Sequence, residues 1–296
     1  MILHEPVLRL ETVEQLAPAG RELLVDCTVG NGGHTEALLE AGAKRVLGFD
    51  RDAEVLPLAR NRLEVWKERV ELLHADFRKV EQVLDGRGIK KIDGALADLG
   101  CSSIQLGTDG RGFSFRRADP LDMRMDRSQG RTLAELLDEV TPAALADVIF
   151  EYGEERCSRR IARAIVRARD RNNISNTVDL ANVIKRSMPY RGRTRIHPAT
   201  KTFQALRIWV NQELDGLDTF LRMVVSRLRA GARLAIISFH SLEDRIVKYT
   251  LRELERAGEL TVRSSLTRKP IRPGCDELAR NPRARSAKLR VAERML

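Results

Sequence analysis

The chain has 296 residues, of which 43% are hydrophobic and 32% charged, so it can bury one large core or two smaller ones. No apolar stretch approaches the roughly 18 residues that span a bilayer, and the amino terminus lacks a secretory signal pattern, so we expect a globular cytoplasmic protein without membrane association. The net charge of +10 favours a polyanionic partner, first of all a nucleic acid.

The first hundred residues alternate strand and helix patterns, as doubly wound parallel sheets do. Strands are predicted at 22–27, 44–50, 69–76 and 92–100, and helices at 35–42 and 53–68. Between about 107 and 216 only helices are predicted, at 132–139, 142–151, 155–171, 177–187 and 199–214.

The sheet pattern returns at 232–239, and a helix follows from 242 to about 257 with Ser241 as its expected N-cap. Two late strands, at 259–265 and 286–293, can close the sheet as an antiparallel pair. The sequence therefore predicts an α/β protein with a core made of 1–106 and 215–296, and a helical insertion at 107–214 after strand four.

The stretch DCTVGNGGHT, residues 26 to 35, places three glycines directly after the first strand. A dinucleotide-binding turn reads GxGxxG, but here Thr35 stands where the third glycine is required. Asp26 would also repel a pyrophosphate. The loop therefore favours a cationic ligand without phosphate, and S-adenosylmethionine is such a ligand.

Acidic residues end the first four predicted strands: Asp26, Asp50, Asp76 and Asp98. The carboxyl ends of parallel strands meet at one edge of a sheet, where open α/β folds bind ligands. Asp50 is predicted to accept hydrogen bonds from ribose hydroxyls, and Asp26 is a further candidate for the cofactor's ammonium on charge grounds. The alternative is that these acids only form turns and cap helices. It explains a single acid as well as a cofactor site does, but it explains four acids at the ends of four successive strands less well.

Asp98 begins DLGCSSIQLG after the fourth strand and could hold an amine acceptor toward a methyl group. RGFSF, at 111–115, could stack on an extruded base, but anchoring of the insertion on its core is the favoured interpretation. The histidines and the four separated cysteines show no ligand spacing, so no metal site is predicted.

Three basic clusters could follow a phosphate backbone. Four arginines recur on one face of a predicted helix: Arg160, Arg163, Arg167 and Arg171. YRGRTR adds three more in a loop, among them Arg191 and Arg193. The third cluster is NPRARSAKLR. Solvated surface explains each cluster equally well when it is taken alone.

Together the motifs resemble the bacterial RsmH family, also called MraW, which methylates N4 of a cytosine in small-subunit ribosomal RNA with S-adenosylmethionine. The resemblance runs nearly end to end, through HEPVLRLE, DCTVGNGGHT, GFDRD, DLGCSSIQL, RGFSF, DPLDMRMD, YGEER, HPATKTFQALRIWVN, ISFHSLEDRIVK and NPRARSAKLRVAE. It implies a class I (Rossmann-like) methyltransferase fold with a substrate-recognition insertion. The implied target is cytosine 1402 of 16S ribosomal RNA within the small ribosomal subunit.

The resemblance also implies which residues contact the cofactor: Gly32, Gly33, His34, Asp50, Phe77, Asp98 and Gln105. The chain departs from the family pattern at Cys101, Ile104 and Gly107, where valine, proline and aspartate commonly stand. The last two departures alter the expected shape of that loop.

Three alternatives remain at this stage. A DNA amino-methyltransferase would carry a proline-proline-aromatic motif after strand four, and DLGCSSI has none. A ribosome-assembly factor could bind RNA without catalysis, and a nicotinamide oxidoreductase conflicts with the broken glycine pattern. The oligomeric state is open, with a homodimer as one alternative.

Overall fold

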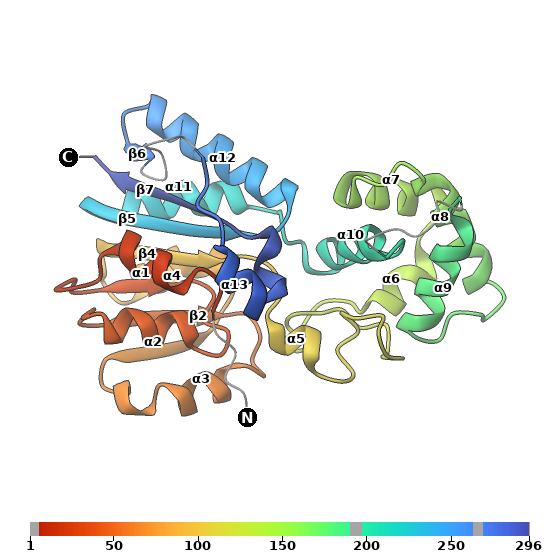
Figure 1. The fold of residues 1–296 in the computed structure, drawn as a ribbon, viewed down its shortest axis with the longest axis horizontal. Helices are drawn as coiled ribbons and strands as arrows, with labels where there is room; N and C mark the ends of the chain where they lie inside the picture. Colours follow the sequence, from red (N-terminus) through yellow and green to blue (C-terminus); the bar gives the residue numbers. More distant parts are fainter. Residues whose placement is uncertain (1–5, 190–196, 263–268, 296) are drawn as a thin grey trace. The chain divides into compact units, whose positions relative to one another are not determined.

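The computed structural model of the chain describes residues 6–189, 197–262 and 269–295 (Figure 1). The chain divides into two compact units: Met1–Gly100 with Leu214–Leu296, and Cys101–Glu213. The second unit thus starts several residues before the predicted position 107. Arg191 and Arg193 lie outside the described residues. None of the described helices combines the length and apolar character needed to cross a membrane.

A mixed sheet forms the centre of the first unit, and its described strands follow the order β3-β2-β1-β4-β5-β7-β6. The strands are β1 Leu24–Asp26, β2 Val46–Asp50, β3 Val70–His74, β4 Ile92–Asp98, β5 Leu228–Ser238, β6 Leu260–Val262 and β7 Lys288–Arg294. Strands β1 to β5 pair in parallel, whereas β7 runs antiparallel to β5 and β6. The order reverses between β1 and β4, and open α/β sheets bind ligands at such switch points.

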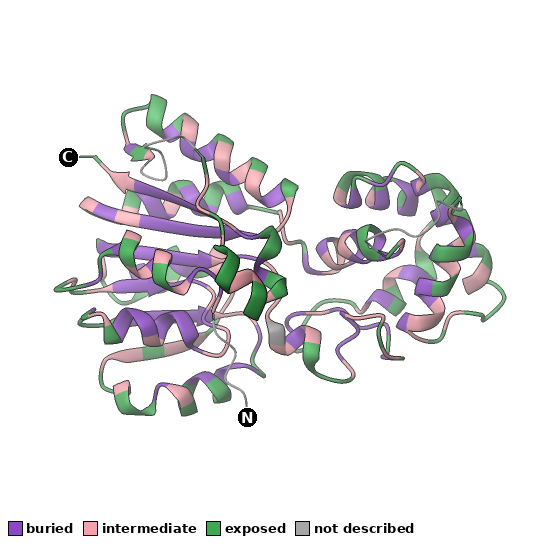
Figure 2. Ribbon diagram, in the orientation of Figure 1, coloured by how far each residue is buried: buried purple, intermediate pink, exposed green. Residues whose placement is uncertain are grey.

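Helices cover both faces of this sheet, which confirms the predicted Rossmann-like α/β class. One face carries α1 Arg9–Leu16, α2 Gly33–Glu40 and α3 Leu56–Arg62, and the other carries α4 Val80–Gly86, α11 Leu217–Arg227 and α12 Ser241–Arg256. The strands between them are largely buried (Figure 2). Short elements complete the unit: η1 Glu64–Trp66, η2 Phe77–Lys79, α13 Cys275–Arg280 and η3 Pro282–Ser286.

Two details of the helix prediction are wrong. The helix expected over 53–68 is the shorter α3 followed by η1, and α12 has His240 rather than Ser241 as its N-cap. Helix α11 was not predicted. It buries Leu217, Phe220 and Leu221 against the sheet.

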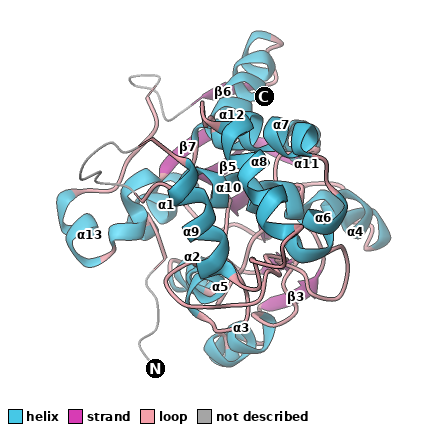
Figure 3. Ribbon diagram, turned by 90° about the vertical axis from the view of Figure 1, so that its right-hand side faces the viewer, coloured by secondary structure: helices cyan, strands magenta, loops and turns pink. Residues whose placement is uncertain are grey.

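The second unit consists of helices and loops in its described part (Figure 3). Its helices are α5 Ser103–Gly107, α6 Leu133–Glu139, α7 Pro142–Gly153, α8 Ser158–Arg169, α9 Thr177–Ser187 and α10 Thr200–Asn211. They enclose a core of their own that includes Ile149, Ile161 and Phe203. Phe115 of RGFSF lies 4.8 Å from the Phe203 ring, centroid to centroid, so it anchors this unit as expected.

Candidate active site

The glycine loop joins β1 to α2 and requires two left-handed backbone conformations. Gly30 has φ +55° and Gly32, the N-cap of α2, has φ +84°. A Cβ added to Gly32 would also lie 3.0 Å from Leu63 Cδ1. Glycine is therefore needed here for the backbone conformation itself.

Asp26 fixes this loop from inside the protein. It is fully buried; its Oδ2 accepts a hydrogen bond from Thr35 Oγ1 at 2.6 Å and its Oδ1 accepts one from the Thr28 amide at 3.1 Å. Burial raises the pKa of this carboxyl, against the lowering effect of the Thr35 hydrogen bond. Both oxygens thus hold the two ends of the loop, and a contact of Asp26 with the cofactor's ammonium group stays a prediction.

Asp50 ends β2 and faces the same loop. Its Oδ2 accepts a hydrogen bond from the Gly30 amide at 2.7 Å, and its Oδ1 accepts one from the Asp52 amide at 2.8 Å. Burial raises the pKa of the carboxyl to about 6. Each carboxylate oxygen can accept a second hydrogen bond, so Asp50 can also receive hydroxyl donors.

His34 and Asp98 form the polar part of the site at the switch point. His34 lies in the first turn of α2, is 5% exposed, and places Nε2 3.6 Å from Asp98 Oδ2. Among the described residues, neither ring nitrogen of His34 nor Oδ1 of Asp98 has a hydrogen-bond partner. Buried polar atoms are nearly always hydrogen-bonded in native proteins, so these three atoms indicate a site for a polar ligand.

Two residues that the sequence analysis did not single out position these groups. The hydroxyl of Thr28 accepts a hydrogen bond from the Asp98 amide at 2.6 Å, which ties the loop to the end of β4. A Cβ added to Gly48 of β2 would lie 2.5 Å from Val29 Cγ2, so this glycine lets the loop pack on the strand. A glycine inside a predicted strand is the signal that could have found it.

The fourth predicted acid, Asp76, has a different role. Burial would raise the pKa of its carboxyl, but hydrogen bonds from Arg78 and the charges of Arg51 and Arg78 bring it below the usual value. It caps η2, in which Phe77 lies with its ring centroid 4.6 Å from that of Phe220. Phe77 is thus held by α11, and its contact with an adenine stays a prediction.

Gln105 belongs to the second unit, where it forms a capping box with Ser102 at the start of α5. Its Oε1 accepts a hydrogen bond from the Ser102 amide at 2.9 Å, and its own amide donates to Ser102 Oγ at 3.1 Å. The side chain therefore stabilises the turn after β4, and its predicted contact with the cofactor remains untested.

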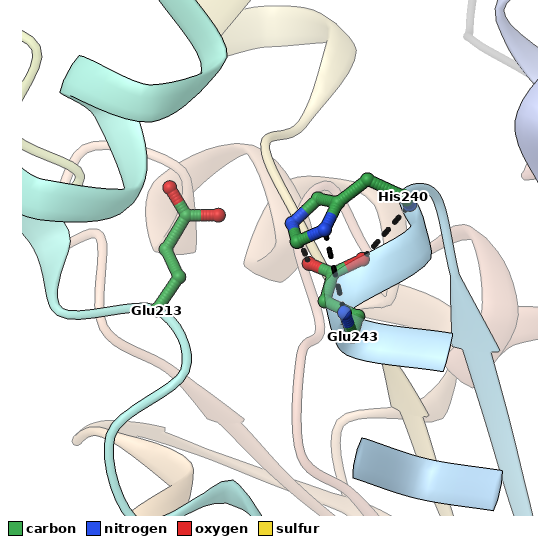
Figure 4. Close-up of side chains that lie close together, drawn as sticks. All are labelled: Glu213, His240 and Glu243. Carbon is green, nitrogen blue, oxygen red and sulfur yellow. Dashed lines mark hydrogen bonds and ion pairs between the residues drawn. The ribbon is translucent and has the colours of Figure 1, made fainter. Parts of the chain in front are cut away.

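His240 and Glu243 form another buried polar pair, at the start of α12 (Figure 4). Glu243 Oε2 accepts hydrogen bonds from the Phe239 and His240 amides, and the Glu243 amide donates to His240 Nδ1 at 3.3 Å. His240 Nε2 lies 3.1 Å from Glu243 Oε1. Both side chains thus serve to cap the helix, and this explains why a histidine stands at the N-cap position.

The strand order, the glycine loop and the acids at the switch point match the Rossmann-like fold of S-adenosylmethionine-dependent methyltransferases. The particular family follows from comparison with known proteins. Residues 1–295 match the model of the MraW methylase family, and the chain belongs to that family.

Curated relatives agree with this assignment. The chain is 48% identical to "Ribosomal RNA small subunit methyltransferase H" of Sorangium cellulosum over 99% of this chain and 91% of the relative. It is 46% identical to the protein of the same name from Geobacter, over 99% of this chain and 98% of that one. A putative methyltransferase from Streptococcus mutans, solved in complex with SAH, is 14% identical with a TM-score of 0.44 and covers 99% of this chain and 100% of its own.

Proposed function

We propose that this enzyme transfers a methyl group from S-adenosylmethionine to N4 of cytosine 1402 in 16S ribosomal RNA, in the cytoplasm. The observation that carries the proposal is the pair His34 and Asp98, whose buried polar atoms lack partners among the described residues at the switch point of the sheet. The name shared by the relatives at 48% and 46% identity supports ribosomal RNA of the small subunit as the substrate.

The residues present fit the cofactor. We assign its binding to the glycine-loop stretch Gly32, Gly33 and His34, with Asp50 on the ribose hydroxyls. Phe77, Asp98 and Gln105 complete the proposed set. S-adenosylmethionine supplies an electrophilic methyl group on a sulfonium. The carboxylates beside the glycine loop suit the positive charge of that sulfonium.

Asp98 is the residue that we assign to the acceptor. Its free Oδ1 can accept a hydrogen bond from the N4 amine of cytosine and so aim the nitrogen lone pair at the methyl carbon. The nitrogen–carbon bond forms as the carbon–sulfur bond breaks, and the amine then loses one proton. Positioning supplies most of the rate enhancement, because the reaction needs no strong base.

Arg160, Arg163 and Arg167 of α8 are the proposed contacts with the RNA, together with Arg191 and Arg193. The first three side chains are exposed. They would bind phosphates, whereas the target base must be unstacked to reach the site.

Transfer of labelled methyl groups tests the function directly. Small ribosomal subunits that lack this modification and, in a separate reaction, unmethylated DNA are incubated with the enzyme and labelled cofactor, and the modified nucleotide is mapped by mass spectrometry. Label on N4 of cytosine 1402 is the expected result. Label on DNA would show an amino-methyltransferase of another class, and the absence of both label and cofactor binding would show a non-catalytic RNA-binding factor.

Cofactor affinity should depend on the ionisation of Asp50. Because burial raises the pKa of its carboxyl to about 6, the group is protonated below that pH and accepts hydroxyl hydrogen bonds less well. Titration calorimetry at several pH values should show affinity falling about tenfold per pH unit below 6, and constant affinity between pH 7 and 8. Asp50→Asn should bind more weakly at pH 7.5 and lose this pH dependence; a variant with the wild-type profile would contradict the assignment.

Removal of arginines from the exposed face of α8 should weaken binding of RNA and leave binding of S-adenosylmethionine unchanged. We expect Arg160→Ala combined with Arg163→Ala to weaken binding to small-subunit RNA about tenfold, since two phosphate contacts are lost. Calorimetry should show unchanged affinity for S-adenosylmethionine. Equal losses of both affinities would contradict this division between the two units.

A further inference from the structure

A groove of about 610 Å³ lies between α8 and α9 in the second unit. Its floor is formed by small apolar side chains, among them Ala164, Ala168 and Val183. Its rim carries three arginines and three asparagines: Arg167, Arg171, Arg186, Asn172, Asn173 and Asn182. Arg167 and Arg171 also belong to the arginine face predicted from the sequence.

The six rim side chains are available to a ligand. None of them makes a hydrogen bond or ion pair with another residue of the described chain, and the three arginines are exposed. Arg169, on the same helix, differs: it donates to the Leu137 and Val140 carbonyls and pairs with Asp170 at 2.8 Å. Helix α8 thus uses Arg169 for its own packing and presents Arg167 to the groove.

The charge of the groove selects an anion. Its lining contains one acid, Asp179, whose Oδ2 accepts hydrogen bonds from the Ser175 amide and from Asn176 Nδ2. That carboxylate therefore stabilises the start of α9, and the three guanidinium groups give the groove an excess of positive charge. Each guanidinium offers five N–H donors in the planar arrangement that suits phosphate oxygens.

The asparagines indicate a ligand that has uncharged polar groups in addition to an anionic one. Amide groups donate and accept hydrogen bonds, so they suit ribose 2′-hydroxyls and the edges of unpaired bases. The small apolar side chains of the lining, Ala164, Ala168 and Val183, leave room for a sugar or a base beside the phosphates. A chain of alternating phosphates and sugars offers partners to both the arginines and the asparagines.

We infer that this groove binds the ribose–phosphate backbone of a single-stranded segment of the RNA. The inference rests on the proposed function. It adds to that function a second RNA-binding site, formed by Arg171, Arg186 and Asn182. The arginines contact phosphates, and the asparagine contacts a 2′-hydroxyl or a base edge. The groove thereby holds RNA outside the target nucleotide and contributes to affinity.

The test compares variants of the full chain for binding to a fluorescein-labelled, unstructured RNA 12-mer by anisotropy at several salt concentrations. Arg171→Gln with Arg186→Gln should lower affinity about tenfold and reduce the slope of log affinity against log salt by about 1.4, as expected for two lost phosphates. Asn182→Ala should lower affinity without changing the slope. The charge-matched control is Arg60→Gln with Arg256→Gln, two exposed arginines of the first unit.

A loss in the groove variant that exceeds the loss in the control supports the site. Equal effects in both, an unchanged slope in the groove variant, or no binding of wild-type protein to the 12-mer would overturn it. Methyl transfer by the wild-type enzyme to small subunits is measured in parallel. If transfer occurs while the groove variant binds RNA normally, the proposed function stands and the groove assignment is wrong.

Discussion

Replacement of Asp98 by alanine is expected to lower the rate of methyl transfer at saturating cofactor at least about a hundredfold. The reason is the loss of the oxygen that holds the acceptor amine. The free energy of unfolding should hardly change, because Oδ1 of Asp98 has no hydrogen-bond partner in the described structure and Oδ2 lies 3.6 Å from His34 Nε2, beyond hydrogen-bond distance.

The measurement is single-turnover methyl transfer to small ribosomal subunits, together with urea unfolding. Asp98→Asn is the matched control, since it keeps the size of the side chain and one carbonyl acceptor, and it should retain more activity than the alanine variant. A variant that loses stability but turns over normally would refute the assignment of Asp98 to the acceptor.

Asp26→Ala, unlike Asp98→Ala, should destabilise the protein: we expect the free energy of unfolding to fall by about 3 kcal/mol. The substitution leaves the buried Thr35 hydroxyl and the Thr28 amide without their acceptor and opens a cavity beneath the glycine loop. Urea unfolding at pH 7 measures the loss. Cofactor affinity should fall as well, since the loop is no longer fixed.

Thr35→Val is the control for this second prediction. It keeps the volume of the side chain and removes one of the two hydrogen bonds, so it should cost about 1–2 kcal/mol. If Asp26→Ala were as stable as the wild-type protein yet unable to bind the cofactor, Asp26 would be a direct ligand, as the sequence alone suggested.

Asp26 and Asp98 show what a sequence can predict about a site and what it cannot. Both end predicted strands, and the parallel arrangement correctly placed them at one edge of the sheet. Their different surroundings depend on Thr28 and Thr35, which donate to the oxygens of Asp26, whereas Oδ1 of Asp98 has no hydrogen-bond partner among the described residues. No periodicity in the sequence shows which acid receives those hydrogen bonds.

Helix α11 and the start of α12 were missed for local reasons. Helix α11 ends at Arg227 and β5 begins at the next residue, Leu228, so no glycine or proline separates the two elements. Periodicity alone does not mark a boundary between elements that follow each other without a linker. His240 is an uncommon N-cap, and it acts as one because its ring nitrogen accepts the hydrogen bond that a serine hydroxyl would normally take.

The position of the second unit within the chain affects how the protein is made. Strand β4 is complete before Cys101, but its neighbour β5 follows only after the whole of Cys101–Glu213. At about 5–20 residues per second, synthesis of that segment takes on the order of ten seconds. During this time β4 has its partner β1 on one side only, and its other edge is open to pairing with other chains until β5 has been made.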